Sequence, residues 1–316
     1  MRRIRVGLVC VGLTVIAIPA IAATQQVPWP KTPSYQANAG STKDAVNVVK
    51  SYSNSFINSK LANWLSRTDI NYAIQTDNKP VGSIETIQPL YQNSQHTFFW
   101  QGRLAYSNVS TTGNLGLGYR HLADSDKWMW GVNTFYDENV RFLHKRIGIG
   151  GEVFTSYVTF RANYYDAISG RKQVGVSTFE RAVDGFDASL ETPVPYIPWM
   201  RFNMQGYHWD GVTASNVNGG LANLRIFPTR MLEVDAGVAY DNSQHAQAFL
   251  KADLYFGDPA FIEQSASTSG KGKTAFAGQN LEDMRLEKVI RHNDIVVEKT
   301  SSSSGASGSI IVARGT

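Results

Sequence analysis

Residues 144–164, HKRIGIGGEVFTSYVTFRANY, alternate between apolar and polar or glycine positions. Ile147 and Ile149 fall on one face of this stretch, whereas Arg146 and Gly148 fall on the other. A period of two residues is the period of a β-strand, because successive side chains of a strand point to opposite faces of its sheet. The stretch therefore predicts two β-strands, each with one apolar face and one face of charged, amide or glycine residues.

The same period continues from Thr68 to Phe256. It predicts about twelve strands, at residues 68–77, 83–92, 97–107, 111–121, 128–138, 144–154, 157–167, 184–191, 199–209, 218–227, 231–241 and 246–256. Pro89 removes a hydrogen-bond donor from the second of them, and the register of the tenth is left open. An even number of antiparallel strands can close into a barrel that begins and ends on one side of a membrane.

The N-terminus indicates export from the cytoplasm. Three arginines, the last of them Arg5, precede an apolar run at residues 6–18, and small residues follow Pro19. This is the pattern of a secretory signal peptide, which we place at residues 1–23. The apolar run is too short to cross about 30 Å of hydrocarbon as a helix.

Alternation by itself does not distinguish a soluble β-sandwich from a membrane barrel. Three features favour the barrel: the signal peptide, strands of about ten residues, which is the length of a tilted membrane strand, and aromatic residues near strand ends, such as Trp100, Trp128 and Tyr255. The sequence therefore predicts an all-β protein, a closed antiparallel transmembrane β-barrel at residues 68–256. The expected location is the outer membrane of a Gram-negative bacterium, with lipid as the partner of the outer wall.

Composition argues against several other classes of function. Cys10 is the single cysteine and lies in the signal peptide, so disulfides and thiol metal sites are not expected in the mature chain. Without the three signal arginines, 27 basic residues face 26 acidic ones, which removes the charge argument for nucleic-acid binding. The six histidines show no metal or nucleophile spacing. We therefore expect no enzyme activity, no cofactor and no metal.

The segments on either side of the barrel differ from it in composition. Residues 24–67 are predicted to form a periplasmic leader with an amphipathic helix at 42–66, packed against the barrel or inserted in its lumen. Residues 257–299 are predicted to form a Ser/Gly/Lys-rich linker, about three turns of helix at 279–291 and an extended piece from Asp294. Residues 300–316 are rich in Ser and Gly and are predicted to be a disordered tail.

Six stretches resemble, in order, motifs of the translocator domain of inverse autotransporters, the intimin and invasin family. They are Ile84–Tyr91, Asn114–His121 (NLGLGYRH), Trp130–Asp137 (WGVNTFYD), His144–Glu152, Glu180–Asp187 and Leu286–Glu298. This resemblance implies a barrel whose C-terminal segment passes through the lumen and carries a passenger to the cell surface. The segment would include Leu286, Val289, Arg291, Asn293, Ile295 and Val297. It also implies assembly by the barrel-assembly machinery and periplasmic chaperones.

The polar face of the predicted strands faces the lumen in this interpretation. The charged candidates for lumen positions are Arg103, Arg120, Arg146, Glu152, Arg161, Asp187 and Arg201. These side chains either satisfy one another and hold water, or line a conductive or peptide-guiding path.

The sequence departs from the family after Lys299, because only 17 residues follow it and no immunoglobulin-like adhesion domain is among them. The expectation is a translocator with an almost absent passenger, and a separately encoded adhesin is its candidate partner. The alternative is an outer-membrane channel, similar to a porin, without secretion activity.

Overall fold

The computed structural model describes residues 65–75, 80–107, 111–123, 127–229, 231–256, 278–301 and 308–312. The chain divides into two compact units, residues 1–48 and 49–316, and all described residues belong to the second. The predicted signal peptide, nearly all of the amphipathic helix and the linker lie outside the described residues. No helix among the described residues is long and apolar enough to span a membrane.

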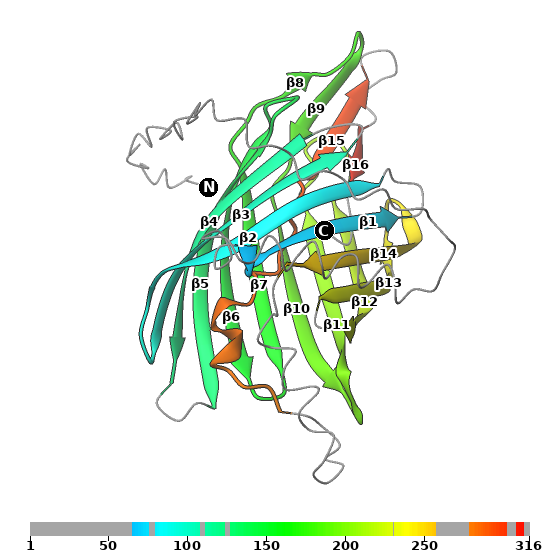
Figure 1. Cartoon of the computed structure of the whole chain (residues 1–316). Coiled ribbons are helices and arrows are strands. Elements are labelled where there is room, and N and C mark those ends of the chain that lie inside the picture. Colours follow the sequence, from blue (N-terminus) through cyan, green and yellow to red (C-terminus); the bar gives the residue numbers. More distant parts are fainter. Residues whose placement is uncertain are drawn as a thin grey trace, which may run out of the picture. The chain divides into compact units, whose positions relative to one another are not determined.

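Twelve antiparallel strands of the described chain close into a barrel (Figure 1). They are β1 (Thr68–Gln75), β2 (Val81–Gln92), β3 (His96–Ser107), β4 (Thr111–Leu122), β5 (Trp128–Asn139), β6 (Lys145–Thr155), β7 (Thr159–Ala167), β10 (Gly185–Val194), β11 (Ile197–Trp209), β12 (Val217–Thr229), β13 (Leu232–Asp241) and β14 (His245–Tyr255). Neighbours along the chain pair with each other, β7 pairs with β10, and β1 closes the barrel against β14 from Asp69 opposite Tyr255 to Gln75 opposite Phe249. The predicted closed barrel and its twelve strands are thus confirmed.

The two uncertain strands are both present. β2 continues through Pro89 by means of a shift in register between Pro89 and Tyr91, a bulge that accommodates the missing donor. The tenth barrel strand, β12, pairs with β11 from Met200 opposite Ile226 to Trp209 opposite Val217.

Burial along the strands is the reverse of that in a soluble protein. Apolar side chains such as Val132 and Ile149 are 50% and 57% exposed, whereas Arg146 and Arg161 are 0% exposed. Since apolar groups gain free energy when they leave water, a wall with this exterior suits a hydrocarbon solvent. The polar faces point inward, where the lumen segment described below covers them.

The barrel has two different ends. One end, which we call the terminal end, is where β1 begins and β14 finishes. The connections between strands at this end are short among the described residues, such as residues 93–95 and 156–158. At the opposite end, which we call the loop end, residues 168–184 connect β7 to β10. Hairpin turns at one end and longer loops at the other are typical of bacterial outer-membrane barrels.

A second sheet of four strands lies at the loop end. It consists of β8 (Lys172–Gln173), β9 (Thr178–Ala182), β15 (Val297–Ser301) and β16 (Gly308–Ile311), in the order β16-β15-β9-β8. The prediction of a disordered tail is therefore wrong for residues 300–301 and 308–311. Its cause is burial: Ile310 and Val312 are 2% and 0% exposed and pack with Trp209 and Val217, which gives this short stretch an apolar anchor.

The segment 278–296 connects the two ends through the barrel interior (Figure 1, orange to red). The three-turn helix predicted at 279–291 is wrong, because the described residues form only a 3-10 turn, η2 (Asp283–Leu286), followed by a chain without helix or strand up to residue 296. The physical reason is competition for the carbonyl groups. Side chains of the barrel wall donate to the carbonyls of this segment, so it does not need helical hydrogen bonds to satisfy them.

Candidate functional site: the lumen and the segment inside it

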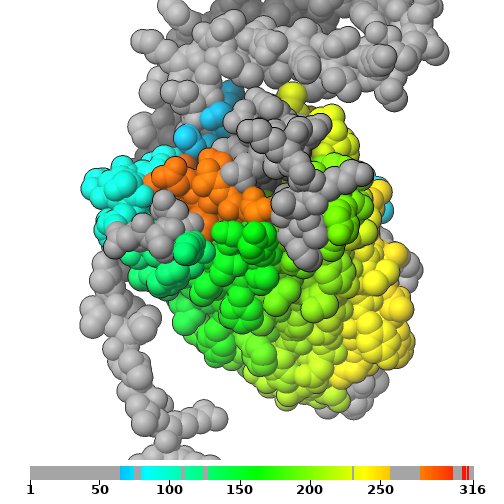
Figure 2. Space-filling model, turned by 90° about the horizontal axis from the view of Figure 1, so that it is seen from below, coloured from blue at the N-terminus to red at the C-terminus, as the bar shows by residue number. Residues whose placement is uncertain are grey.

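The segment is fixed first at the terminal end. Leu281 and Met284 pack into a buried cluster with Leu122, Met129 and Phe154, at the ends of β4, β5 and β6. The Gln279 amide donates to the Ser156 carbonyl at 2.7 Å in the β6–β7 turn. Seen from below, the orange part of the segment lies between cyan and green strands at this mouth (Figure 2).

Arg285 and Arg120 hold the turn η2 from two sides. Arg285 Nε donates to Thr97 Oγ1 at 2.9 Å, and its NH2 group donates to the carbonyls of Asn93 and His96. NH1 of Arg120 donates to three carbonyl oxygens of the segment, those of Met284, Arg285 and Glu287, at 3.3, 3.1 and 2.6 Å. The guanidinium of Arg120 thereby substitutes for backbone donors that a helix would have supplied.

A cluster of charges surrounds Glu287, which is 3% exposed. Its carboxylate lies 3.3, 3.5 and 3.4 Å from guanidinium nitrogens of Arg161, Arg201 and Arg225. The same three arginines also pair with Glu191, at 3.5, 3.0 and 2.7 Å. Buried charges are stable only when they are paired and hydrogen-bonded. Glu287 of the segment therefore adds a second carboxylate to the ion pairs that the three arginines form with Glu191 in the barrel wall.

The middle of the segment is held like an added strand. Val289 donates its amide to Gln101 Oε1 at 2.9 Å, and Gln101 Nε2 donates back to the Val289 carbonyl at 3.4 Å. The Val289 side chain packs against Ile87, Phe99 and Phe135. The side-chain amide of Gln101 thus both donates to and accepts from the Val289 backbone, as a peptide group of a neighbouring strand would.

Arg291 forms a two-point ion pair with the barrel wall. Its NH1 and NH2 lie 2.8 and 2.7 Å from the two carboxylate oxygens of Asp137, and its guanidinium lies 4.4 Å from the centre of the Phe135 ring. Arg146 approaches the same carboxylate at 2.8 Å. Gly148 leaves room for the Arg291 guanidinium, because a Cβ at this position would lie 2.8 Å from Arg291 NH2.

Arg146 and Tyr165 hold the backbone that follows. Arg146 donates to the carbonyls of His292 and Asp294 at 2.6 and 3.0 Å. The hydroxyl of Tyr165 accepts the His292 amide at 2.7 Å and donates to Asp187 at 2.5 Å. These contacts tie the segment to β6, β7 and β10 at once.

Glu298 anchors the segment at the loop end. Its carboxylate accepts three successive backbone amides of the β11–β12 loop, from Val212, Thr213 and Ala214, at 2.8, 2.8 and 2.7 Å. Successive amides that converge on one anion form a concave anion site. Gly308 of β16 leaves room for it, because a Cβ there would meet Glu298 Oε1 at 2.6 Å.

Lys299 and Glu180 join β15 to β9. Lys299 lies 3.0 Å from Glu180, and His144 lies 3.3 Å from the same carboxylate. Burial raises the pKa of Glu180, but hydrogen bonds from His144 and Lys299 outweigh it and lower the pKa below its ordinary value.

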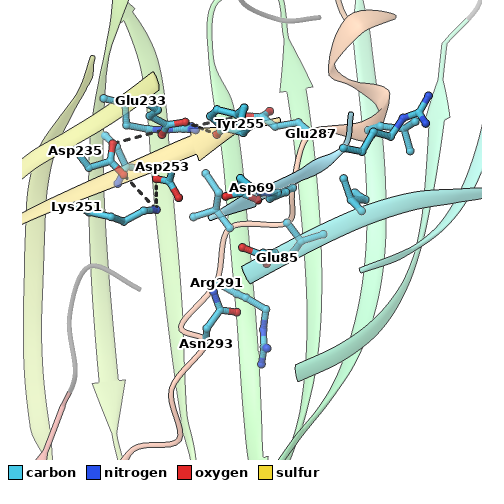
Figure 3. A pocket seen from close by; sticks show the side chains of 18 of the residues that line it. Asp69, Glu85, Glu233, Asp235, Lys251, Asp253, Tyr255, Glu287, Arg291 and Asn293 are labelled. Carbon is cyan, nitrogen blue, oxygen red and sulfur yellow. Dashed lines mark hydrogen bonds and ion pairs between the residues drawn. The ribbon is translucent and has the colours of Figure 1, made fainter. Parts of the chain in front are cut away.

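The side of the lumen near β1 and β12–β14 is less completely filled. A cavity of about 400 Å³ lies there beside the segment. Glu233, Asp235 and Asp253 gather on its wall with carboxylate oxygens within 4.8 Å of one another (Figure 3). Lys251 lies 3.3 Å from Asp235 and 3.2 Å from Asp253, so the lysine ammonium group already pairs with two of these three carboxylates.

The structure brings the predicted lumen residues together. Each is 7% exposed or less: Arg103, Arg120, Arg146, Glu152, Arg161, Asp187 and Arg201. Arg103 lies 3.7 Å from Asp294, and Glu152 lies 2.9 Å from Arg120.

The predicted threaded residues divide into two groups. Val289, Arg291 and Asn293 are buried, and Leu286 packs against the Val289 cluster. Ile295 and Val297 are half-buried, whereas their neighbours Val296 and Glu298 are the buried residues of this stretch.

Sequence reasoning did not single out several residues of the site. They are Gln101, Glu191, Arg225, Glu287 and Glu298. The inward parity of Gln101 and Glu191 was visible in the strand period, since each lies on the polar face of its strand. Arg225 lies in the tenth strand, whose register the sequence left open. Glu287 and Glu298 lie in irregular or short extended pieces, where no period indicates which side chains turn inward.

Comparison with known proteins places this geometry in a family. The family model described as "Inverse autotransporter, beta-domain" matches residues 23–293. The putative attaching and effacing protein homolog of Escherichia coli K12 is 30% identical over 57% of this chain and 65% of its own length. Intimin of Escherichia coli O157:H7 is 26% identical over 76% of this chain and 26% of its own length.

A solved membrane-protein structure shares the fold. It comes from the work "Unveiling the Mechanism Behind the in-meso Crystallization of Membrane Proteins", with a TM-score of 0.62, 20% identity, and coverage of 74% of this chain and 99% of that one. The chain spans 65% of the first relative's length and about a quarter of intimin's.

Proposed function

The chain belongs to the family of inverse autotransporter β-domains, and we propose from this that it threads its own C-terminal segment through its lumen to the cell surface. Its barrel anchors it in the outer membrane of a Gram-negative bacterium. In the proposal the terminal end faces the periplasm and the loop end faces outward, as the short turns of the first and the longer loops of the second favour. The proposal assigns no catalytic step to the chain, and includes the barrel-assembly machinery and periplasmic chaperones as helpers of assembly.

One observation supports threading above all. Eight of the eleven carbonyls of residues 284 to 294 accept hydrogen bonds from inward side chains of several strands, among them Arg120, Asn114 and Arg146. A peptide chain in transit must have its backbone groups satisfied at each level of the lumen. A wall that carries side-chain donors at successive levels meets that requirement for an extended chain.

Surface labelling tests the proposal directly. An epitope inserted after Ser304, in the connection between β15 and β16, should be labelled by antibody on intact cells. An epitope after Ser269, between β14 and the lumen segment, should be labelled only after the envelope is permeabilised. Protection of the Ser304 epitope on intact cells would refute threading to the surface.

A third epitope controls for the orientation of the barrel. Val176 is 100% exposed in the connection between β8 and β9, within the loop that joins β7 to β10. An epitope after Val176 should be labelled on intact cells whether or not the segment is threaded. Labelling at Val176 without labelling at Ser304 would retain the outer-membrane barrel and reject the threaded route.

The cavity beside the segment favours a channel as the second candidate function. Its volume of about 400 Å³ and its charged lining suit small solutes. The two functions differ in the state that conducts. A channel conducts with the segment in place, whereas a plugged translocator conducts only after the segment is removed.

A further inference from the structure

Two histidines face each other on the outer wall of the barrel at its terminal end. His96 begins β3 and His121 lies near the end of β4, and the two are directly opposite partners in the antiparallel register. Both are half-buried, so their rings are ordered by their neighbours but remain accessible. Phe98, two residues after His96 on the same face, is 46% exposed.

The two rings approach each other through the same atom. His96 Nδ1 and His121 Nδ1 are 3.4 Å apart, with ring centres 4.9 Å apart. Two nitrogens bound to one tetrahedral ion at about 2.0–2.1 Å are separated by about 3.3–3.4 Å. The pair is therefore already at the spacing that one metal ion requires.

Neighbouring aromatic rings hold this arrangement. The Trp130 ring lies 5.9 Å from the His121 ring and 5.5 Å from the Tyr119 ring. Tyr119 Oη lies 2.7 Å from His96 Nδ1, where it occupies the same nitrogen that a metal would need. All six histidines are among the described residues, and His96 and His121 are the two whose rings contact each other.

We propose that His96 and His121 bind one divalent transition-metal ion, zinc or copper(II), through their Nδ1 atoms, with water in the remaining positions. Imidazole nitrogens suit these borderline ions. Binding replaces the hydrogen bond between Tyr119 and His96, and the ion joins β3 to β4. Because an ion that binds only the folded state stabilises that state, the bound ion acts as a cross-link between the two strands at the terminal end. The proposal does not depend on threading.

Zinc titration of the untagged, refolded protein tests the site, with a chromophoric chelator as competitor. We expect one ion per chain, and we expect His96→Ala and His121→Ala each to weaken binding at least tenfold. His208→Ala is the matched control, since His208 lies on the outer wall at the loop end with Asn218 and Asp210 as its partners, and should leave binding unchanged. Tyr119→Phe should bind at least as tightly as the unaltered chain, because its hydroxyl competes for the nitrogen.

A second readout separates binding from misfolding. Each variant is first checked for heat-modifiable migration on gels, and zinc should raise the unfolding temperature of the unaltered protein but not of folded His96→Ala. With copper(II), electron paramagnetic resonance should show two nitrogen ligands. Equal zinc affinity in the unaltered protein and in folded His96→Ala or His121→Ala would overturn the proposal.

Discussion

Arg291 of the lumen segment and Asp137 of β5 form a two-point ion pair, with N–O distances of 2.8 and 2.7 Å and both side chains buried. Arg146 of β6 reaches the same carboxylate at 2.8 Å, and Asn114 of β4 reaches it at 2.7 Å. Asp137 thus joins three strands of the wall to the segment. Paired oxygens and a planar guanidinium give this contact directional specificity as well as charge.

Replacing Asp137 should destabilise the protein more than replacing Arg291. Asp137→Ala leaves two buried guanidinium groups, those of Arg146 and Arg291, without their carboxylate, which costs about 3–5 kcal/mol. Arg291→Ala leaves Asp137 paired with Arg146 and should cost about 1–3 kcal/mol. Urea unfolding of liposome-reconstituted protein measures both. Lys145→Ala, which removes a partly exposed pair with Glu138, is the control and should cost less than about 1 kcal/mol. Equal losses at Asp137 and Arg291 would contradict the shared role of the carboxylate.

The cost of a charge on the outer wall should depend on its depth. Ile149 lies in the middle of β6 and is 57% exposed, whereas Tyr157 lies in the β6–β7 turn and is 52% exposed. Ile149→Arg should lower the free energy of unfolding in lipid by about 2–4 kcal/mol, and Tyr157→Arg by about 0–1 kcal/mol. If both arginines cost the same in a bilayer, the outer wall does not lie in hydrocarbon as we describe.

Removing the lumen segment should open the barrel. Deleting residues 257–316 leaves all twelve barrel strands, including the closing pairs of β1 and β14, so the barrel should still fold. Its conductance in planar bilayers should rise well above that of the full chain, because the segment that Arg120 and Arg146 hold no longer occupies the lumen. Heat-modifiable migration checks that the deletion variant is folded. An unchanged conductance in a folded variant would show that the segment is not what blocks the lumen.

A designed disulfide should fix β15 to β9. Ala182 and Val297 are opposite partners, and the adjacent Val183 amide donates to the Val296 carbonyl at 3.1 Å. Ala182 and Val297 therefore form the non-hydrogen-bonded pair, whose Cα atoms lie about 4.5 Å apart, within reach of a disulfide. Ala182→Cys with Val297→Cys should oxidise to completion, as maleimide labelling measures. Ala182→Cys with Val289→Cys is the matched control and should stay reduced.

The attachment of β15 to β9 should weaken in acid. The folded pKa of Glu180 lies below its ordinary value of 4.5, because hydrogen bonds from His144 and Lys299 outweigh burial. A lowered folded pKa contributes stability that is present above the ordinary value and is lost as the pH falls through the folded one. The protection factors of the amides of residues 297–301 against hydrogen exchange, which correct for the pH dependence of intrinsic exchange, should therefore fall below about pH 4.5. Glu180→Gln should remove this pH dependence; if the variant keeps it, another group is responsible.

The sequence by itself determined the barrel, because strand periodicity is a local property. Ile147 and Arg146 differ in polarity at adjacent positions, and a pleated strand must send them to opposite faces. Twelve such stretches behind a predicted signal peptide are compatible with one closed arrangement in lipid, and the strand bounds were predictable for the same reason. The inward position of Arg120 and Arg161 followed from parity as well.

Only the tertiary structure decided what those inward groups meet. Asp137 and Arg291 are 154 residues apart, and their contact depends on the register of closure and on the path of the segment, neither of which leaves a period in the sequence. The segment at 279–291 has the apolar spacing of a helix, yet Arg120 and Gln101 hydrogen-bond to its backbone from the barrel wall, and only a 3-10 turn forms in it. Likewise, His96 and His121 look unrelated along the chain, and they become neighbours because β3 and β4 pair in the register that places them opposite each other.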